Sequence, residues 1–237
     1  MKKMLTAAVS LAVSATVMPA LAYDQGDFIL RAGLTTVAPN SDSEDINLPT
    51  GLVAEADVDD DTQLGLIPVY MVHQNWGIEL LAATPFEHDI EAQGKGAIDG
   101  TNVDAGSTKH LPPTLSLQWY PRGGQEGWQP YLGLGVNWTV FFDEDVDSDL
   151  IALLGDLTGG AVDDAKLSLD QSFGLAAQAG VDIPVGENLS VNLGVQYIDI
   201  ETEAKLKAQA DGATAATVEF DVDIDPWVYT VGIAWRF

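Results

Sequence analysis

The last eleven residues of the chain, 227–237, alternate strictly between large apolar side chains and small or polar ones. Successive side chains of a β-strand point to opposite faces, so the large set forms one wall and the small set the other. Aromatic residues stand at both ends of the large set, as in the lipid-facing band of a membrane barrel. A soluble sandwich could show this pattern once, but the pattern favours a strand that contacts lipid on one side. The large set is Trp227, Tyr229, Val231, Ile233, Trp235 and Phe237.

The amino terminus is typical of an exported protein. Lys2 and Lys3 precede an apolar stretch over residues 5–17, and residues 20–22, Ala-Leu-Ala, fit a signal-peptide cleavage site. The stretch is too short for a transmembrane helix, which needs about 20 apolar residues. We therefore predict a signal peptide over 1–22 and a single outer-membrane β-barrel domain over 23–237. The chain has no cysteine, which suits a closed barrel that needs no disulfide.

The chain is strongly acidic, with 36 Asp and Glu against 10 Lys and Arg and a net charge of −26. This charge excludes nucleic acid as a partner, because nucleic acids are bound by basic surfaces. Sixteen of the 36 acids lie in two segments between strand-like runs, around 42–61 and 143–164. The charge therefore belongs to the loops and not to the barrel wall.

Alternating runs predict an all-β fold, an eight-stranded antiparallel transmembrane β-barrel with long extracellular loops and short periplasmic turns. The long connections cover about 38–61, 87–109, 143–166 and 202–216, and the short ones lie at 73–74, 121–127 and 184–188. Residues 148–157 predict a short helix ended by Gly159 and Gly160, either a lid or a packed surface turn. The eight runs are 27–37, 62–72, 75–86, 110–120, 128–142, 167–183, 189–201 and 217–237.

The same alternation assigns charged residues to the lumen. Arg31, Glu79 and Arg236 face inward, where an unpaired charge is costly, so we expect Arg31 or Arg236 to pair with Glu79 or Asp182. Inward glycines either let a tightly curved wall close around bulky neighbours or leave space. Eight strands enclose an interior just wide enough for side chains, which excludes a general water-filled porin. The inward glycines are Gly33, Gly65, Gly77, Gly133, Gly135, Gly174, Gly180, Gly194 and Gly232.

Prolines mark one seam of the predicted barrel. Pro85 lies toward the outer end of the third strand, and Pro112 and Pro113 lie toward the outer end of the fourth. Proline has no N–H to donate, so the strand ladder should be weak there. Two interpretations remain open: a lateral exit into the bilayer, or strand ends blunted above the membrane. Apolar inward residues would supply a path toward the seam, namely Ile67, Val69, Met71 and Leu81.

The sequence gives little support for a catalytic site, a metal site or a bound cofactor. The three histidines, His73, His88 and His110, fall in loops or at strand ends, where solvated or hydrogen-bonded roles are expected. His88 stands beside Asp89, but no nucleophile signature accompanies it, and we predict no enzyme. Residues 57–61 and 143–147 resemble the start of a calcium loop, yet both lack the sixth-position Gly and the twelfth-position Glu. We predict no cofactor and no metal site.

Several segments together resemble the outer membrane protein W family over nearly the whole mature chain. They are residues 27–33, 76–86, 110–114, 118–120, 130–131, 141–143, 197–200 and 225–228. The resemblance implies an eight-stranded barrel with a hydrophobic channel, proposed to carry small apolar molecules across the lipopolysaccharide leaflet, and relatives associated with alkane uptake. It also implies that Leu81 faces this channel. Gln196 stands where the family often has bulkier residues such as Trp, which argues against a tight apolar constriction there.

The sequence thus predicts a narrow channel for small hydrophobic molecules in the outer membrane of a Gram-negative bacterium. Its expected partners are membrane lipid, lipopolysaccharide and the apolar solute. The C-terminal Phe237 resembles the signal by which the barrel-assembly machinery recognises its substrates. The alternative is a structural or interaction barrel whose acidic loops bind divalent ions, lipopolysaccharide or another cell surface.

Overall fold

The computed structural model describes residues 22–40, 42–43, 45–47, 53–95 and 100–237. Eight antiparallel strands form the predicted barrel. In the order of their pairing, the first strand, β12 (Ser172–Pro184), also pairs with the eighth, β10 (Gln129–Val146), so the barrel is closed. All but the last residue of the expected signal peptide lies outside the described residues. In order around the barrel the strands are β1 (Phe28–Ala38), β5 (Asp61–His73), β6 (Trp76–Ala83), β9 (Thr114–Trp119), β10 (Gln129–Val146), β12 (Ser172–Pro184), β13 (Leu189–Ile198) and β16 (Trp227–Arg236).

Strand register keeps the two faces of the wall distinct. Gly33 lies opposite Gly232 on one side and Gly65 on the other, so three inward glycines meet in one row. The next residue, Leu34, lies opposite Val231 and Leu64, and all three are exposed on the outer face. The period-two alternation therefore sorts small residues to the lumen and large apolar residues to the outside.

The outer face carries an apolar band between two levels of aromatic side chains. Trp76, Trp119 and Trp235 are exposed near the end with the short turns, and Trp138 and Trp227 are exposed at the other end of the band. This is the pattern of a lipid-facing barrel wall. Among the described residues, no helix combines the length and apolar character needed to cross a membrane.

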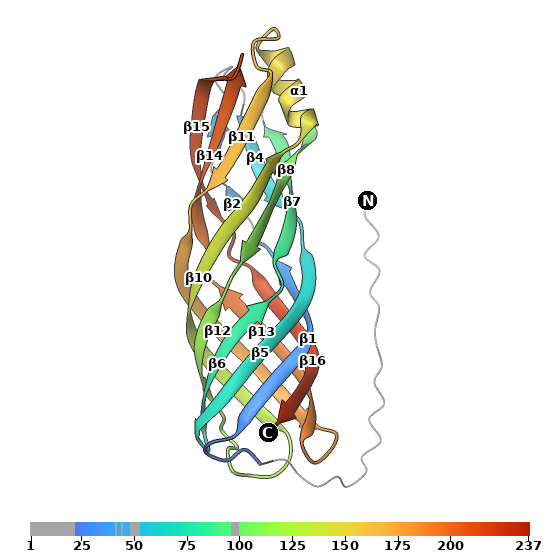
Figure 1. Cartoon of the computed structure of the whole chain (residues 1–237), viewed down its shortest axis with the longest axis vertical. Coiled ribbons are helices and arrows are strands. Elements are labelled where there is room, and N and C mark those ends of the chain that lie inside the picture. Colours follow the sequence, from blue (N-terminus) through green and yellow to red (C-terminus); the bar gives the residue numbers. More distant parts are fainter. Residues whose placement is uncertain (1–21, 41, 44, 48–52, 96–99) are drawn as a thin grey trace.

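The long connections are not open loops, because most of them fold as further strands that extend the barrel upward in Figure 1. One row continues from β10 through β8, β7 and β4 to β3, and a second sheet has the order β11-β14-β15-β2. We call this upper part, together with α1 (Ser148–Leu157), the extension. Its strands are β2 (Asp42–Ser43), β3 (Ile46–Asn47), β4 (Val53–Val58), β7 (Phe86–Lys95), β8 (Asn102–Leu111), β11 (Asp164–Leu169), β14 (Glu201–Ala210) and β15 (Ala213–Asp223).

Five of the eight predicted runs are each divided between the barrel and the extension. Pro85 separates β6 from β7, Pro112 and Pro113 separate β8 from β9, and Pro226 separates β15 from β16. A proline inside a strand removes a ladder hydrogen bond, which explains three of these breaks. The other two fall at residues 170–171, between β11 and β12, and at residues 199–200, between β13 and β14.

Helix α1 forms over the residues that the sequence predicts. Its N-cap is Asp147, whose carboxylate accepts a hydrogen bond from the backbone N–H of Asp149 at 2.9 Å. The chain leaves the helix through Gly159, at φ +68°, a conformation that glycine adopts without strain. Leu150 and Leu154 are buried, so the helix packs over the extension instead of standing free.

Candidate functional site: the lumen and the cavities above it

A buried arginine closes the lower half of the barrel. The Arg31 side chain, 1% exposed, donates to Glu79 at 2.5 Å and reaches both carboxylate oxygens of Asp182, at 2.7 and 3.2 Å. Its guanidinium also lies 4.3 Å above the ring centre of Tyr131, a cation–π contact. The structure therefore brings Arg31, Glu79 and Asp182 together in the lumen.

Amide and phenol groups satisfy the remaining oxygens of these carboxylates. Glu79 accepts hydrogen bonds from Gln118 at 2.6 Å and from Gln178 at 2.8 Å. Asp182 accepts from the Tyr23 hydroxyl at 2.8 Å and from Asn192 at 2.7 Å. Buried charges are tolerated when they are paired and fully hydrogen-bonded, and both carboxylates meet this condition.

Arg236, the fourth predicted member of the charge network, does not join it. Its guanidinium donates to the Ala22 carbonyl at 2.6 Å and lies 3.6 Å from Asp27, at the end of the barrel with the short turns. β16 ends at this residue, so its side chain reaches the rim and not the ion pairs.

The inward glycines allow this packing. A Cβ on Gly180 would collide with the Tyr131 ring, and a Cβ on Gly133 would collide with the Gln178 side chain. Glycine thus lets the curved wall close around bulky neighbours, the first of the two expected uses. Side chains of the described strands fill the lower lumen.

The predicted channel-lining residues divide into two levels. Ile67 and Leu81 belong to an apolar cluster in the upper lumen, together with Val37, Phe86 and Val228. Val69 and Met71 instead pack in the lower lumen with the three tyrosines Tyr23, Tyr120 and Tyr131. The prediction that Val69 and Met71 line a path is therefore wrong, since side chains of the closed half surround them.

Gln196 lies between the two levels. Its side chain, 6% exposed, borders a cavity of about 20 Å³ that Ile67, Leu81 and Arg31 also line. This cavity has room for little more than one water molecule. The lumen at Gln196 is narrow although the residue is polar.

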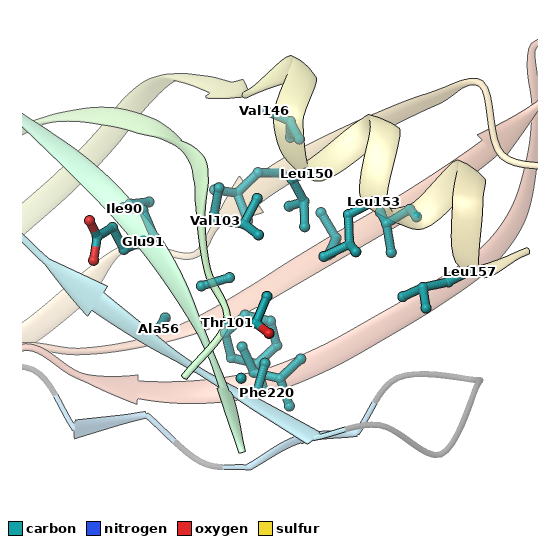
Figure 2. Close-up of a pocket in the computed structure, with 18 residues that line it drawn as sticks. Ala56, Ile90, Glu91, Thr101, Val103, Val146, Leu150, Leu153, Leu157 and Phe220 are labelled. Carbon is teal, nitrogen blue, oxygen red and sulfur yellow. The ribbon is translucent and has the colours of Figure 1, made fainter. Parts of the chain in front are cut away.

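Two larger cavities lie above the barrel, inside the extension. The first has a volume of about 120 Å³ and is walled by Ile90, Val103 and Phe220, with leucines of α1 above it. Figure 2 shows Leu150, Leu153 and Leu157 on the side of α1 that borders this cavity. The second has a volume of about 60 Å³. The two cavities adjoin, because Ala56, Ile90, Leu167 and Phe220 line both.

Two histidines line the second cavity. His88 and His110 are 2% and 4% exposed, so neither is solvated, whereas His88 has the hydrogen-bonded role that was the other expectation. Burial lowers the pKa of His88 and lowers the pKa of His110 to about 3, so both rings are neutral at pH 7. A usable sequence signal existed: Phe86, His88 and Ile90 alternate with Glu87 and Asp89, as in a strand. The third histidine, His73, is exposed at a short turn.

The strand ladder is interrupted at the predicted seam. β6 pairs with β9 up to Leu81 opposite Thr114, and β7 pairs with β8 from Phe86 opposite His110. Pro85, Pro112 and Pro113 lie in the segments between these pairs. Behind the interruption stand Leu81 and Phe86, both members of the upper apolar cluster. The prolines thus separate barrel from extension at a point where apolar side chains stand behind the wall on one side and the buried hydroxyl of Thr114 on the other.

The sequence and the fold have counterparts among known proteins. The model of the OmpW family matches residues 24–237. Outer membrane protein W of Vibrio cholerae serotype O1 is 41% identical over 219 residues, which is 92% of each chain. Outer membrane protein AlkL of Ectopseudomonas oleovorans is 25% identical over 91% of this chain and 84% of its own length.

A solved structure agrees with this relationship. The crystal structure of the outer membrane protein OprG from Pseudomonas aeruginosa is 42% identical and superposes with a TM-score of 0.75, covering 91% of this chain and 98% of that one. The matched relatives are outer-membrane proteins of Gram-negative bacteria, and the barrel described above has the same form. The chain therefore belongs to the OmpW family and is an outer-membrane β-barrel of a Gram-negative bacterium.

Proposed function

We propose that this protein takes up small hydrophobic molecules from outside the cell and releases them sideways into the outer membrane. The observation that carries the proposal is the pair of adjoining apolar cavities in the extension, above a lumen that ion pairs and amides fill. An apolar solute gains roughly 25 cal/mol for each Å² of surface that such a cavity removes from water. The cavities therefore give the solute an apolar site to occupy as it crosses the hydrophilic lipopolysaccharide layer.

The lower lumen makes an axial route unfavourable. A solute moving toward the periplasm would have to break the contacts of Arg31 with Glu79 and Asp182. It would then re-enter water and lose the free energy gained by burial. The bilayer core, in contrast, keeps the solute in an apolar phase.

The interrupted ladder supports a lateral exit. Between the pairs Leu81–Thr114 and Phe86–His110, no ladder pairing joins the two sides of the wall in the described residues. Opening this seam needs side chains of the upper apolar cluster to move, but few backbone hydrogen bonds to break. A solute leaving there passes from the extension to lipid without crossing the ion pairs.

The test is uptake of two radiolabelled solutes of similar size, one an alkane and one a sugar, by cells with and without the protein. A variant that fills both cavities, Ala56→Trp, is compared with Ala213→Trp, which places the same bulk at the exposed tip of a hairpin. Surface abundance of each variant is measured alongside.

We expect the protein to raise alkane uptake severalfold and leave sugar uptake unchanged. Ala56→Trp should remove most of the gain because no space remains for the solute, and Ala213→Trp should keep it. Equal gains for alkane and sugar, or alkane uptake that does not depend on the protein, would overturn the proposal.

A further inference from the structure

The second cavity of the extension has two histidine rings in a wall that is otherwise apolar except for Thr108, Thr139 and Thr202. His88 and His110 lie nearly parallel, with ring centres 4.9 Å apart and an angle of 12° between their planes. Phe86 stacks on His110 at 5.5 Å, and Phe141 lies 5.8 Å from it on β10. Strand pairing fixes the arrangement, since both Phe86 and Phe141 stand opposite His110. The rings are therefore held in place by neighbours on both sides.

The protonation of His88 follows from its hydrogen bond. Its Nδ1 lies 2.5 Å from the backbone carbonyl oxygen of Asp59, and a carbonyl can only accept. Nδ1 therefore carries the proton of the neutral ring, and Nε2 presents an unprotonated lone pair. The bond fixes His88 as a hydrogen-bond acceptor toward its surroundings.

Both Nε2 atoms are buried and have no hydrogen-bond partner among the described residues. Buried polar atoms in folded proteins are nearly always satisfied, so an unsatisfied pair beside a cavity points to a group that binds there. Any such group must donate to His88. Two hydrogen bonds of about 2.8 Å that meet at one oxygen join donor and acceptor atoms about 5 Å apart. The centres of the two rings are 4.9 Å apart, so one oxygen can bind both rings.

We infer that His88 and His110 form a binding site for the hydroxyl group of a small apolar alcohol or phenol. The hydroxyl donates to His88 Nε2, and its oxygen accepts from His110 when that ring carries its proton on Nε2. The apolar part of the molecule lies along the adjoining cavity, past Ile90 and Phe220. This inference rests on the proposed function and narrows its solute class.

Other ligand classes fit the cavity less well. A carboxylate would be an unpaired negative charge beside neutral rings, close to Asp60 and Asp61, whose charges act on His88. An ammonium group would enter an almost wholly apolar wall in which no carboxylate is available to it. A pure hydrocarbon would fill the space but leave both Nε2 atoms unsatisfied. A neutral hydroxyl satisfies them without introducing a charge.

The experiment uses the purified full-length protein in lipid nanodiscs and two ligands of similar size, 1-octanol and nonane. Binding is measured after correction for partition into lipid. The variants are His88→Phe and His110→Phe, with His73→Phe, an exposed histidine at a turn, as the matched control. Nitrogen-15 NMR of the histidine rings in the unaltered protein gives a second readout that does not depend on any variant folding.

We expect the unaltered protein and His73→Phe to bind octanol about tenfold more tightly than nonane. His88→Phe should lose this preference and still bind nonane. Octanol, but not nonane, should shift the Nε2 resonance of His88. Equal affinity for the two ligands with no such shift would overturn the hydroxyl site and indicate that a water molecule satisfies the rings.

The two proposals fail in different ways. Nonane that binds the protein and is taken up by cells, without any preference for octanol, would leave the uptake function standing and remove the hydroxyl site. A preference for octanol in nanodiscs, combined with uptake that does not depend on the protein, would retain the site and remove transport.

Discussion

Arg31 shows how one buried residue can decide the route through a barrel. Its guanidinium is neutralised by two carboxylates from different strands, β6 and β12, and each carboxylate accepts further hydrogen bonds from neighbouring side chains. Removing one carboxylate leaves a balanced pair of charges but takes away the acceptor of several buried donors. Loss of either carboxylate should therefore destabilise the barrel.

Replacing one carboxylate by its amide tests this role. Glu79→Gln should lower the free energy of unfolding by about 1–3 kcal/mol, because a single neutral amide oxygen replaces the two charged oxygens that accept from Arg31, Gln118 and Gln178. The measurement is urea unfolding in lipid vesicles, followed by tryptophan fluorescence. Glu203→Gln is the matched control, since Glu203 pairs with Lys205 in water and its loss should leave the midpoint unchanged. An unchanged midpoint for Glu79→Gln would mean that the network adds nothing.

The buried histidine pair predicts a pH dependence with a definite sign. Burial lowers the pKa of His110 to about 3, while the unfolded chain titrates near 6.5. Below about pH 6.5 the unfolded state binds a proton that the folded state does not, so stability is fully present above that pH and is lost as the pH falls toward 3.

His110→Phe should remove this part of the pH dependence. Between pH 7.5 and pH 4.5 the unaltered protein should lose roughly 2 kcal/mol more stability than the variant. Carboxylate titration affects both proteins alike, so the comparison isolates the histidine. Identical losses in the two proteins would show that His110 is protonated without penalty.

At the scale of elements, proline and capping residues set where strands and helices end. The interruption at Pro85, Pro112 and Pro113 was readable from the sequence, because proline cannot donate to a ladder. The strands beyond it were harder to read, since only Phe86, His88 and Ile90 of β7 alternate clearly and β8 is made mostly of small and polar residues. Their pairing is long-range, and the chain on either side reads as an acidic loop.

The sequence pattern also failed to predict how the residues of the lumen are arranged along the barrel axis. Alternation assigned Ile67, Val69 and Met71 to the inner face, as the structure places them, but it carries no information about height along the barrel axis. Val69 lies opposite Glu79, at the level of the ion pairs, so it packs in the lower lumen. Ile67 belongs to the apolar cluster of the upper lumen. The partners of Arg31 could be anticipated from charge alone, because few inward residues could neutralise it.

The capping role of Asp147 in helix α1, which packs over the extension, can be tested by hydrogen exchange. Asp147→Ala removes the N-cap, a change that typically costs about 0.5–2 kcal/mol, and should speed hydrogen exchange of the α1 amides without affecting barrel amides. Asp156→Ala is the control at the other end of the helix, where a negative charge opposes the helix dipole and its removal should not speed exchange. Equal acceleration by both substitutions would contradict the capping role.

At the scale of the whole molecule, the long and short connections lie at opposite ends and give the barrel its direction. The extension and the acidic residues stand at one end, and the turns near His73 and Gly124 at the other (Figure 1). Outer-membrane barrels turn their longer connections outward, so we expect the extension and its cavities to lie on the exterior side.

Surface labelling checks this orientation. Tags inserted at Asp59 or Asp156 should be accessible to a membrane-impermeant reagent on intact cells, because both residues lie in the extension. A tag at Gly124 should react only after the outer membrane is permeabilised. Labelling of Gly124 on intact cells would reverse the direction proposed for uptake.

The most direct test of the account is to lock the seam between barrel and extension. Continuing the register from Leu81–Thr114 places Ala82 opposite Pro113 on the outer face, and a disulfide in Ala82→Cys/Pro113→Cys would join the two sides. Leu34→Cys/Leu64→Cys makes the matched link across an uninterrupted ladder. The account predicts that oxidation of the seam pair stops uptake of a radiolabelled alkane and that reduction restores it, while the control pair transports alike in both states. Equal alkane uptake by the oxidised and reduced seam proteins would contradict it.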